Sequence, residues 1–99
     1  MIIILRQWVI SKFNLWEFEL EYVESLLELD VRNNSAWNHR WFVIHYNNSS
    51  LPIPSDILQR ELLFTYEMIN KASKNESAWN YLRGLAKYHT ELIHEIIKK

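Results

Sequence analysis

The chain has 99 residues with one glycine, two prolines and no cysteine, and 48% of its residues are apolar. This length allows a single domain, the scarcity of turn residues excludes a fold of many short strands, and the lack of cysteine excludes disulfides and thiolate metal ligands. The formal net charge of −1 gives no field that would attract nucleic acid or an anionic membrane. We expect an all-α protein of the reducing cytoplasm that binds no nucleic acid.

The first two predicted helices lie in residues 1–29. The apolar run at residues 1–5 should begin inside a helix, and it is too short for a signal peptide core or for membrane insertion. In residues 16–29, apolar side chains at steps of four and three form one stripe. That stripe is Trp16, Leu20, Val23 and Leu27. The rest of this helix is predicted to be a solvated acidic face. Its members are Glu17, Glu19, Glu21, Glu24 and Glu28.

Two further helices are predicted on either side of a polar loop at residues 46–55. The first starts with Asn33 or Asn34 as its cap, because a side-chain oxygen there can accept from the free amides of the first turn. Its apolar stripe is Trp37, Trp41 and Ile44. The second follows Pro54, with Ser55 as its cap. Its stripe is Leu58, Leu62, Tyr66 and Ile69.

The last two predicted helices start near Ser77, with Asn75 or Glu76 before it, and at residue 91. The apolar residues of the fifth helix are Ala78, Leu82 and Leu85. Those of the sixth are Leu92, Ile93, Ile96 and Ile97. The linkers after the second and fourth helices are short, so they should join antiparallel neighbours.

An internal repeat organises these helices. Residues 33–38 match residues 75–80 at five of six positions with an offset of 42, and residues 6–10 align with residues 40–44. Each unit is a helix, a short turn and a second helix, and such a unit must stack on its neighbours to bury its apolar faces. We predict an all-α fold of the α-α superhelix type, with five or six helices. Its repeat remnants lie near residues 5–29, 30–72 and 73–99.

Residues 33–44, Asn-Asn-Ser-Ala-Trp-Asn-His-Arg-Trp-Phe-Val-Ile, resemble the repeat of protein prenyltransferase α subunits. That repeat has the core Asn-x-x-x-Trp-x-x-Arg followed by an apolar pair. Further stretches, in the same order, are similar to the α subunit shared by protein farnesyltransferase and geranylgeranyltransferase type I. They are residues 6–10, 30–35, 66–69 and 75–82. The chain is expected to be a middle portion of such a subunit.

The resemblance implies a scaffold that binds a prenyltransferase β subunit. In that family the β subunit holds the zinc ion and most of the diphosphate pocket, and a magnesium ion can assist diphosphate departure. The heterodimer joins a farnesyl or geranylgeranyl group to the Cys of a C-terminal Cys-a-a-X motif. The α subunit adds a lysine and a tyrosine from a Lys-Asn-Tyr repeat, where this chain reads Arg-Asn-Asn and Lys-Asn-Glu. We therefore predict that the chain alone is inactive, with no catalytic, cofactor-binding or metal-binding residue.

The residues of the repeat motif are predicted to hold the repeats together or to contact the partner. They are Arg32, Asn33, Asn34, Ser35, Trp37, Asn38, Arg40, Asn75, Ser77, Trp79 and Asn80. Trp37, Trp41 and Trp79 are expected in the core as wedges between helices. Arg40 flanks the packed stripe and must find a carboxylate or carbonyls, because an unpaired buried charge costs several kcal/mol. The four histidines lack the i, i+4 spacing of a metal site and should be solvated or hydrogen-bonded.

Two alternatives stay open. The first is a tetratricopeptide-like helical-repeat adaptor without an enzymatic role. It is favoured by the offset of 34 residues between 6–10 and 40–44, although its Trp-x-x-Leu-Gly-x-x-Tyr signature is missing. The second is the α subunit of Rab geranylgeranyltransferase, from the same superfamily. Copurification with a β subunit separates the adaptor from the prenyltransferases.

Overall fold

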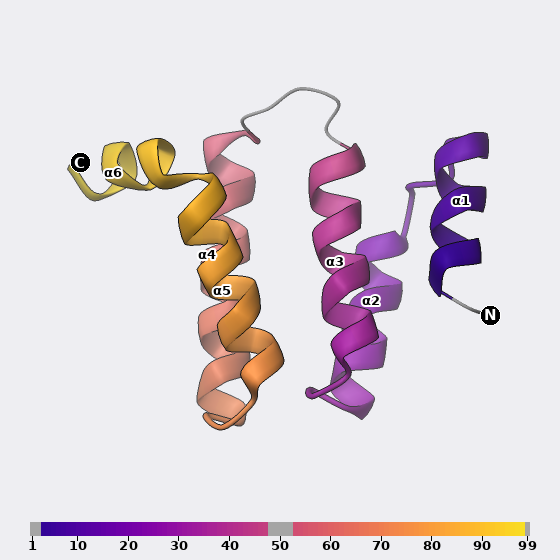
Figure 1. Ribbon diagram of the computed structural model, residues 1–99, viewed down its shortest axis with the longest axis horizontal. Coiled ribbons are helices and arrows are strands. Elements are labelled where there is room, and N and C mark those ends of the chain that lie inside the picture. The colour runs from indigo at the N-terminus through magenta and orange to yellow at the C-terminus, as the bar shows by residue number, and fades with distance from the viewer. Residues whose placement is uncertain (1–2, 48–52, 99) are drawn as a thin grey trace. The chain divides into compact units, whose positions relative to one another are not determined.

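A computed structural model describes residues 3–47 and 53–98, which form six α-helices and no strand (Figure 1). The helices are α1 (Ile3–Phe13), α2 (Glu19–Leu29), α3 (Asn34–Asn47), α4 (Ser55–Lys71), α5 (Glu76–Tyr88) and α6 (Thr90–Lys98). The predicted all-α class with five or six helices is confirmed. Met1, Ile2, the side chain of Ile96 and the middle of the predicted loop, residues 48–52, lie outside the described residues. The chain divides into two compact units, Met1–Ser49 and Ser50–Lys99.

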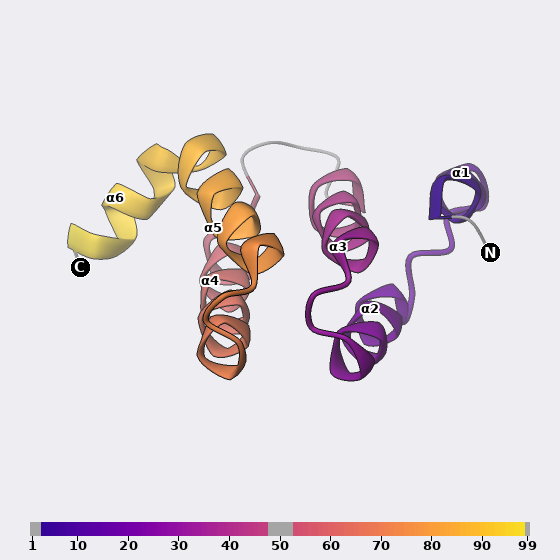
Figure 2. The same ribbon diagram turned by 60° about the horizontal axis from the view of Figure 1, so that its bottom comes forward.

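The first unit is a hairpin with one additional helix. A short turn joins α2 to α3, the two helices lie antiparallel, and α1 packs on α3 (Figure 1 and Figure 2). Val23 and Leu27 are buried four residues apart on α2, and Trp37 and Ile44 are buried on α3, as their spacing predicted. The buried apolar residues of this unit are Ile10, Val23, Leu27, Ala36, Trp37, Val43 and Ile44.

The second unit repeats the hairpin. Helices α4 and α5 lie antiparallel, and α6 follows α5 after the single turn residue His89 (Figure 2). Its buried apolar residues again recur at helical spacing. They are Ile53, Leu58, Met68, Ile69, Ala78, Tyr81 and Leu85.

The two hairpins share the same contact between a tryptophan and the preceding turn. The Trp37 indole Nε1–H donates to the Val31 carbonyl at 2.9 Å, and the Trp79 indole donates to the Ser73 carbonyl at 2.8 Å. In each case the acceptor lies six residues before the tryptophan. The repeat seen in the sequence is therefore a repeat of hydrogen bonds, because equivalent side chains reach equivalent carbonyls.

The predicted asparagine caps are confirmed in both hairpins. Asn33 precedes α3, and its side-chain oxygen accepts from the Ala36 amide at 3.1 Å. Asn75 precedes α5, and its side-chain oxygen accepts from the Ser77 amide at 3.1 Å. Each asparagine thus satisfies one free amide of the first helical turn, which fixes where the second helix of the repeat begins.

Two predicted helix starts are wrong. Ser55 is the first helical residue of α4 and not its cap; the cap position is Pro54, and the Ser55 hydroxyl accepts from Gln59. Helix α2 begins at Glu19, three residues later than predicted, because Phe18 adopts the left-handed conformation with φ of 66°. A left-handed residue cannot continue a right-handed helix, so Trp16 lies in the connection before α2.

The predicted stripe of α4 is also partly wrong. Tyr66 is 61% exposed, whereas Glu61 and Thr65 are fully buried. A helix turns every 3.6 residues, so consecutive steps of four drift around its surface and carry Tyr66 away from the face that begins at Leu58. The sequence argument passed over Glu61 and Thr65 because both are polar.

Trp79 does not lie in the core, although Trp37 does. Trp37 is 2% exposed and Trp79 is 38% exposed. Trp79 is in the first turn of α5, whereas α6 adjoins the last turn of that helix. Among the described residues of its own unit, no further helix therefore covers the outer face of this indole.

Candidate functional site

The most densely bonded polar residue of the first unit is Glu19, the first residue of α2. It was predicted to be solvated with the other glutamates of this helix, and that prediction is wrong, because Glu19 is only 7% exposed. Glu19, Val23 and Leu27 follow one another at steps of four and are all buried. The carboxyl therefore lies on the face of α2 that packs inward, whereas Glu21 points to solvent.

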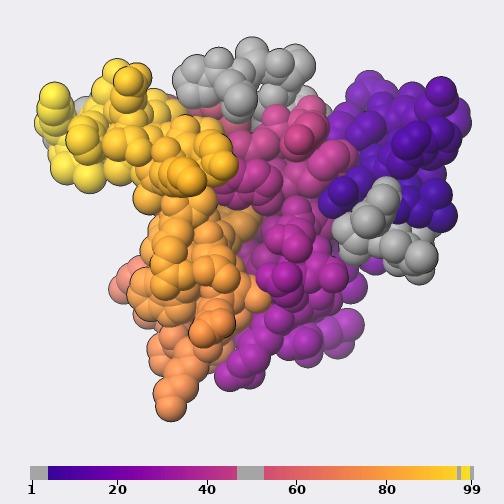
Figure 3. All heavy atoms as spheres, in the orientation of Figure 1, coloured from indigo at the N-terminus to yellow at the C-terminus, as the bar shows by residue number. Residues whose placement is uncertain are grey.

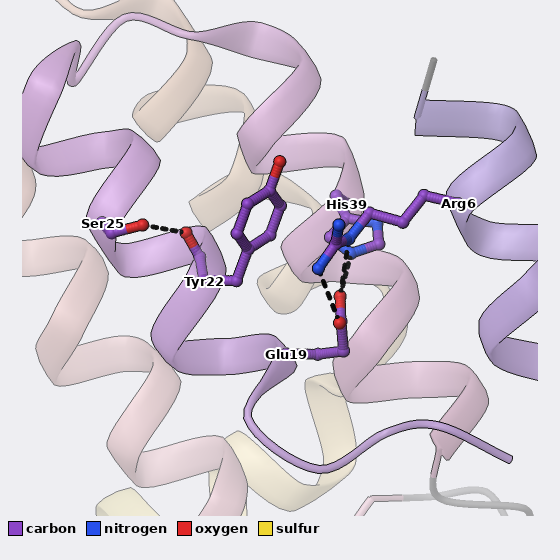
Figure 4. Close-up of polar contacts among 5 residues, drawn as sticks. All are labelled: Arg6, Glu19, Tyr22, Ser25 and His39. Carbon is purple, nitrogen blue, oxygen red and sulfur yellow. Dashed lines mark hydrogen bonds and ion pairs between the residues drawn. The ribbon is translucent and has the colours of Figure 1, made fainter. Parts of the chain in front are cut away.

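Glu19 joins three helices (Figure 4). Arg6 of α1 binds its carboxylate with two hydrogen bonds, Nη2 to Oε1 at 2.8 Å and Nε to Oε2 at 3.1 Å. His39 of α3 approaches from the other side, with Nε2 2.9 Å from Oε2. The Arg6 guanidinium also lies 3.6 Å from the centre of the Tyr22 ring. We call Arg6, Glu19, Tyr22 and His39 the Glu19 cluster.

The surroundings of Glu19 fix its charge and the tautomer of its neighbour. Burial by itself raises the pKa of the Glu19 carboxyl, but the hydrogen bonds and charges of Arg6 and His39 outweigh burial and lower the net pKa below 4.5. At neutral pH this carboxylate can only accept, so His39 must carry a hydrogen on Nε2. His39 Nδ1 is buried without a hydrogen-bond partner in the described part of the chain.

The Glu19 cluster resembles a catalytic carboxylate–histidine pair only in its contacts. A general base must reach the proton that it abstracts, and His39 is fully buried. Tyr22 is held from behind, because the Ser25 hydroxyl donates to its carbonyl at 2.6 Å. The arrangement is suited to holding α1, α2 and α3 together and not to acting on a substrate.

Acid is expected to weaken the first unit through Glu19. A carboxyl whose pKa is lowered in the folded state stabilises the fold above its unfolded-state pKa, and this contribution is lost as the pH falls through the folded value. The urea midpoint, followed by tryptophan fluorescence, should therefore fall between about pH 5 and pH 3 more steeply in the wild type than in Glu19→Gln. Identical pH profiles for the two proteins would contradict this assignment.

The second hairpin contains an equivalent buried carboxylate. Glu61 of α4 lies 42 positions after Glu19, is fully buried, and accepts from the Tyr81 hydroxyl at 2.7 Å. Tyr81 in turn lies 42 positions after His39. In each hairpin, a carboxylate of the first helix is therefore hydrogen-bonded to the residue two positions after the motif tryptophan. The sequence argument missed both carboxylates, although their shared offset was a signal that could have revealed them.

The structure separates the predicted motif residues into two groups. Trp37, Arg40 and Asn75 are buried, and Asn33 and Ser77 are half-buried. Those that face solvent are Arg32, Asn34, Ser35, Asn38, Trp79 and Asn80.

Arg40 finds a carboxylate, as predicted. Its side chain is 1% exposed, and its Nη1 lies 3.4 Å from Glu24 Oε1. Arg40 was the charged motif residue expected beside the packed stripe. The exposed motif residues make local contacts where contacts are described. Asn80, for example, accepts from Arg83 at 2.6 Å.

The described residues hold no group of three or more histidine, aspartate or glutamate side chains arranged to bind a metal ion. His39 and His45 are hydrogen-bonded, and the His45 ring stacks on Trp41 with centroids 3.8 Å apart. Within the same residues, every helix is too short or too polar to cross a bilayer.

These hairpins, each with an asparagine cap, a tryptophan anchored to the turn and a buried carboxylate, define a helical-repeat protein. The profile of the family described as "Protein prenyltransferase alpha subunit repeat" matches residues 16–47 and 58–89. The two matches cover more than half of the chain and repeat the offset of 42 residues. The chain belongs to this family, and the resemblance stated from its motif is confirmed.

Individual relatives agree with the family match. The chain is 50% identical over 72 residues to the protein farnesyltransferase/geranylgeranyltransferase type-1 subunit alpha of Dictyostelium discoideum, which covers 73% of this chain and 22% of that protein. The subunit of the same name from Pisum sativum is 47% identical over 77 residues, covering 78% and 23%. The geranylgeranyl transferase type-2 subunit alpha of Saccharomyces cerevisiae is 31% identical over 80 residues, covering 76% and 24%. The chain thus spans less than a quarter of these relatives.

Proposed function

We propose that this chain is a scaffold segment of the α subunit of a heterodimeric protein prenyltransferase. The observation that carries the proposal is the pair of family repeats, each closed by the same tryptophan and carboxylate contacts. The identity of 50% to a type-1 subunit alpha, against 31% to a type-2 subunit alpha, favours the farnesyl and type I geranylgeranyl enzymes. The division into repeat remnants near 5–29, 30–72 and 73–99 stays a prediction.

In the proposed heterodimer, chemistry and scaffold are divided between the subunits. The β subunit would hold the zinc ion, with magnesium as an aid, and would bind the prenyl diphosphate and the Cys-a-a-X protein. This chain would supply helical repeats and a partner surface in the cytoplasm. Its own buried polar residues are occupied in joining helices, which suits a subunit that supports an active site without containing one.

The exposed motif residues are the proposed partner surface. Asn34, Ser35 and Asn38 face solvent from one end of α3, and Arg32 faces solvent in the turn before it. Their neutral or basic side chains would offer hydrogen bonds to an adjoining subunit. The buried motif residues, Arg40 among them, serve the fold instead.

The test uses a chimera, because the chain covers a small part of its relatives. The matching segment of the Dictyostelium discoideum type-1 subunit alpha is replaced by this chain, and the chimera is coexpressed with the β subunit of a farnesyltransferase. We expect the two subunits to copurify and to transfer a farnesyl group to a Cys-a-a-X peptide. The 99-residue chain alone should transfer nothing and should bind neither zinc nor farnesyl diphosphate in calorimetric titrations.

Three outcomes would change the proposal. A folded chimera that does not retain the β subunit would contradict it. Copurification with a type-2 β subunit, but not with a type-1 β subunit, would reassign the chain to the Rab enzyme. Tight binding of zinc or diphosphate by the chain alone would show a site that the described residues do not contain.

A further inference from the structure

Helix α1 is held to its unit by a narrow set of contacts. Ile10 is its one described side chain that is almost fully buried, at 3% exposure. Three large apolar residues of the same stretch, Leu5, Trp8 and Phe13, are more than half exposed. In the space-filling view, α1 lies at the surface of the first unit (Figure 3). Little apolar area therefore secures this helix, and its polar contacts carry correspondingly more of the attachment.

Those polar contacts are concentrated on Arg6. The guanidinium binds the Glu19 carboxylate through two hydrogen bonds and lies over the Tyr22 ring. Its side chain retains 22% exposure, so water reaches the pair from one side. His39, on the opposite side of the same carboxylate, is fully buried and belongs to the hairpin. If α1 left, Glu19 would keep its bond to His39, and the hairpin would keep a partner for its buried carboxylate (Figure 4).

The connection between α1 and α2 is strained. Asn14 and Phe18, at its two ends, have φ of 56° and 66°. Asparagine tolerates this left-handed conformation, but phenylalanine does not, because its Cβ crowds the backbone. Phe18 has no side-chain cap bond to α2 and is mostly exposed, so its own contacts do not offset the strain. A strained residue persists where the surrounding contacts hold it, and Glu19 is the next residue in the chain.

We propose that α1 is a detachable helix, latched to the α2–α3 hairpin by the Arg6–Glu19 pair and biased toward release by the left-handed Phe18. The helix opens as a unit while α2 and α3 stay folded. Opening exposes the Glu19 carboxylate and the Tyr22 ring, which Arg6 covers in the closed state. The device does not depend on the proposed enzymatic role, because it rests on contacts within the first unit alone.

Hydrogen exchange of the full chain tests the latch. In Arg6→Gln, amides of residues 7–13 should exchange about tenfold faster or more, because a charge-assisted pair is lost, and amides of α2 and α3 should change by less than about twofold. In Phe18→Asn, which tolerates the left-handed conformation, α1 amides should exchange about threefold more slowly. Lys12→Gln is the matched control, because it removes a positive charge from an exposed position of the same helix and should leave exchange unchanged.

Each alternative result overturns the latch. Equal acceleration in α1, α2 and α3 of Arg6→Gln would make the pair a general element of the unit. Unchanged exchange of α1 in that variant would show that other contacts hold the helix. Faster exchange of α1 in Phe18→Asn would show that Phe18 supports the closed state.

Discussion

Trp37→Ala is expected to lower the free energy of unfolding by about 3–5 kcal/mol, as the removal of a large buried aromatic side chain usually does. The Trp37 side chain is 2% exposed, and its indole N–H donates to the Val31 carbonyl at 2.9 Å. The substitution would leave a cavity in the α2–α3 hairpin and would release the turn that precedes α3. Urea unfolding followed by circular dichroism measures the loss.

Trp79→Ala is the matched control within the same chain. Trp79 makes the equivalent bond to the Ser73 carbonyl at 2.8 Å but is 38% exposed. It therefore loses the same hydrogen bond with far less buried area, and we expect a cost below about 2 kcal/mol. Equal losses in the two variants would mean that the bond to the turn, and not burial, dominates the role of this tryptophan. A negligible loss in Trp37→Ala would place that side chain on a surface.

Much of the fold was predictable because it depends on local rules. The caps at Asn33 and Asn75 are confirmed, since an asparagine ahead of a helical pattern can accept from its first free amides. The spacing of Val23 and Leu27 gave the buried face of α2 correctly. The repeat offset of 42 residues carried these local inferences from one hairpin to the next.

The errors arose where side chains from distant positions decide the structure. Nothing local distinguishes Glu19 from Glu21, because both lie in the same acidic run. Glu19 is buried because Arg6 and His39, 13 and 20 residues away, both reach its carboxylate. The left-handed Phe18 was likewise not predictable, since its residue type disfavours that conformation and only packing around it can hold it there.

The candidate partner residues could be found from the motif, but their roles could not be assigned. A repeat motif combines residues that build the hairpin with residues that face outward. The structure buries Trp37 and Arg40 and exposes Asn34 and Asn38, within a stretch of seven residues. Sequence spacing alone does not make that separation, because it depends on where the neighbouring helices lie.

Glu19→Ala is expected to destabilise the first unit by about 3 kcal/mol, toward the lower end of the cost of breaking a buried ion pair, because Arg6 is partly exposed. The substitution removes the acceptor of Arg6 and of the fully buried His39 together. It should therefore weaken α1 and the hairpin alike, whereas Arg6→Gln should release α1 alone. Urea unfolding gives the loss, and hydrogen exchange shows how it is distributed among the helices.

Glu21→Ala provides the comparison, because it removes an exposed carboxylate from the same helix two residues later. Its effect should lie within about 0.5 kcal/mol, as is usual for surface substitutions. The difference between the two variants measures what the bonds to Arg6 and His39 contribute beyond the loss of one negative charge. If both variants lost the same small amount, Glu19 would belong to the solvated face that the sequence predicted, and the three helices would be joined by their apolar contacts alone.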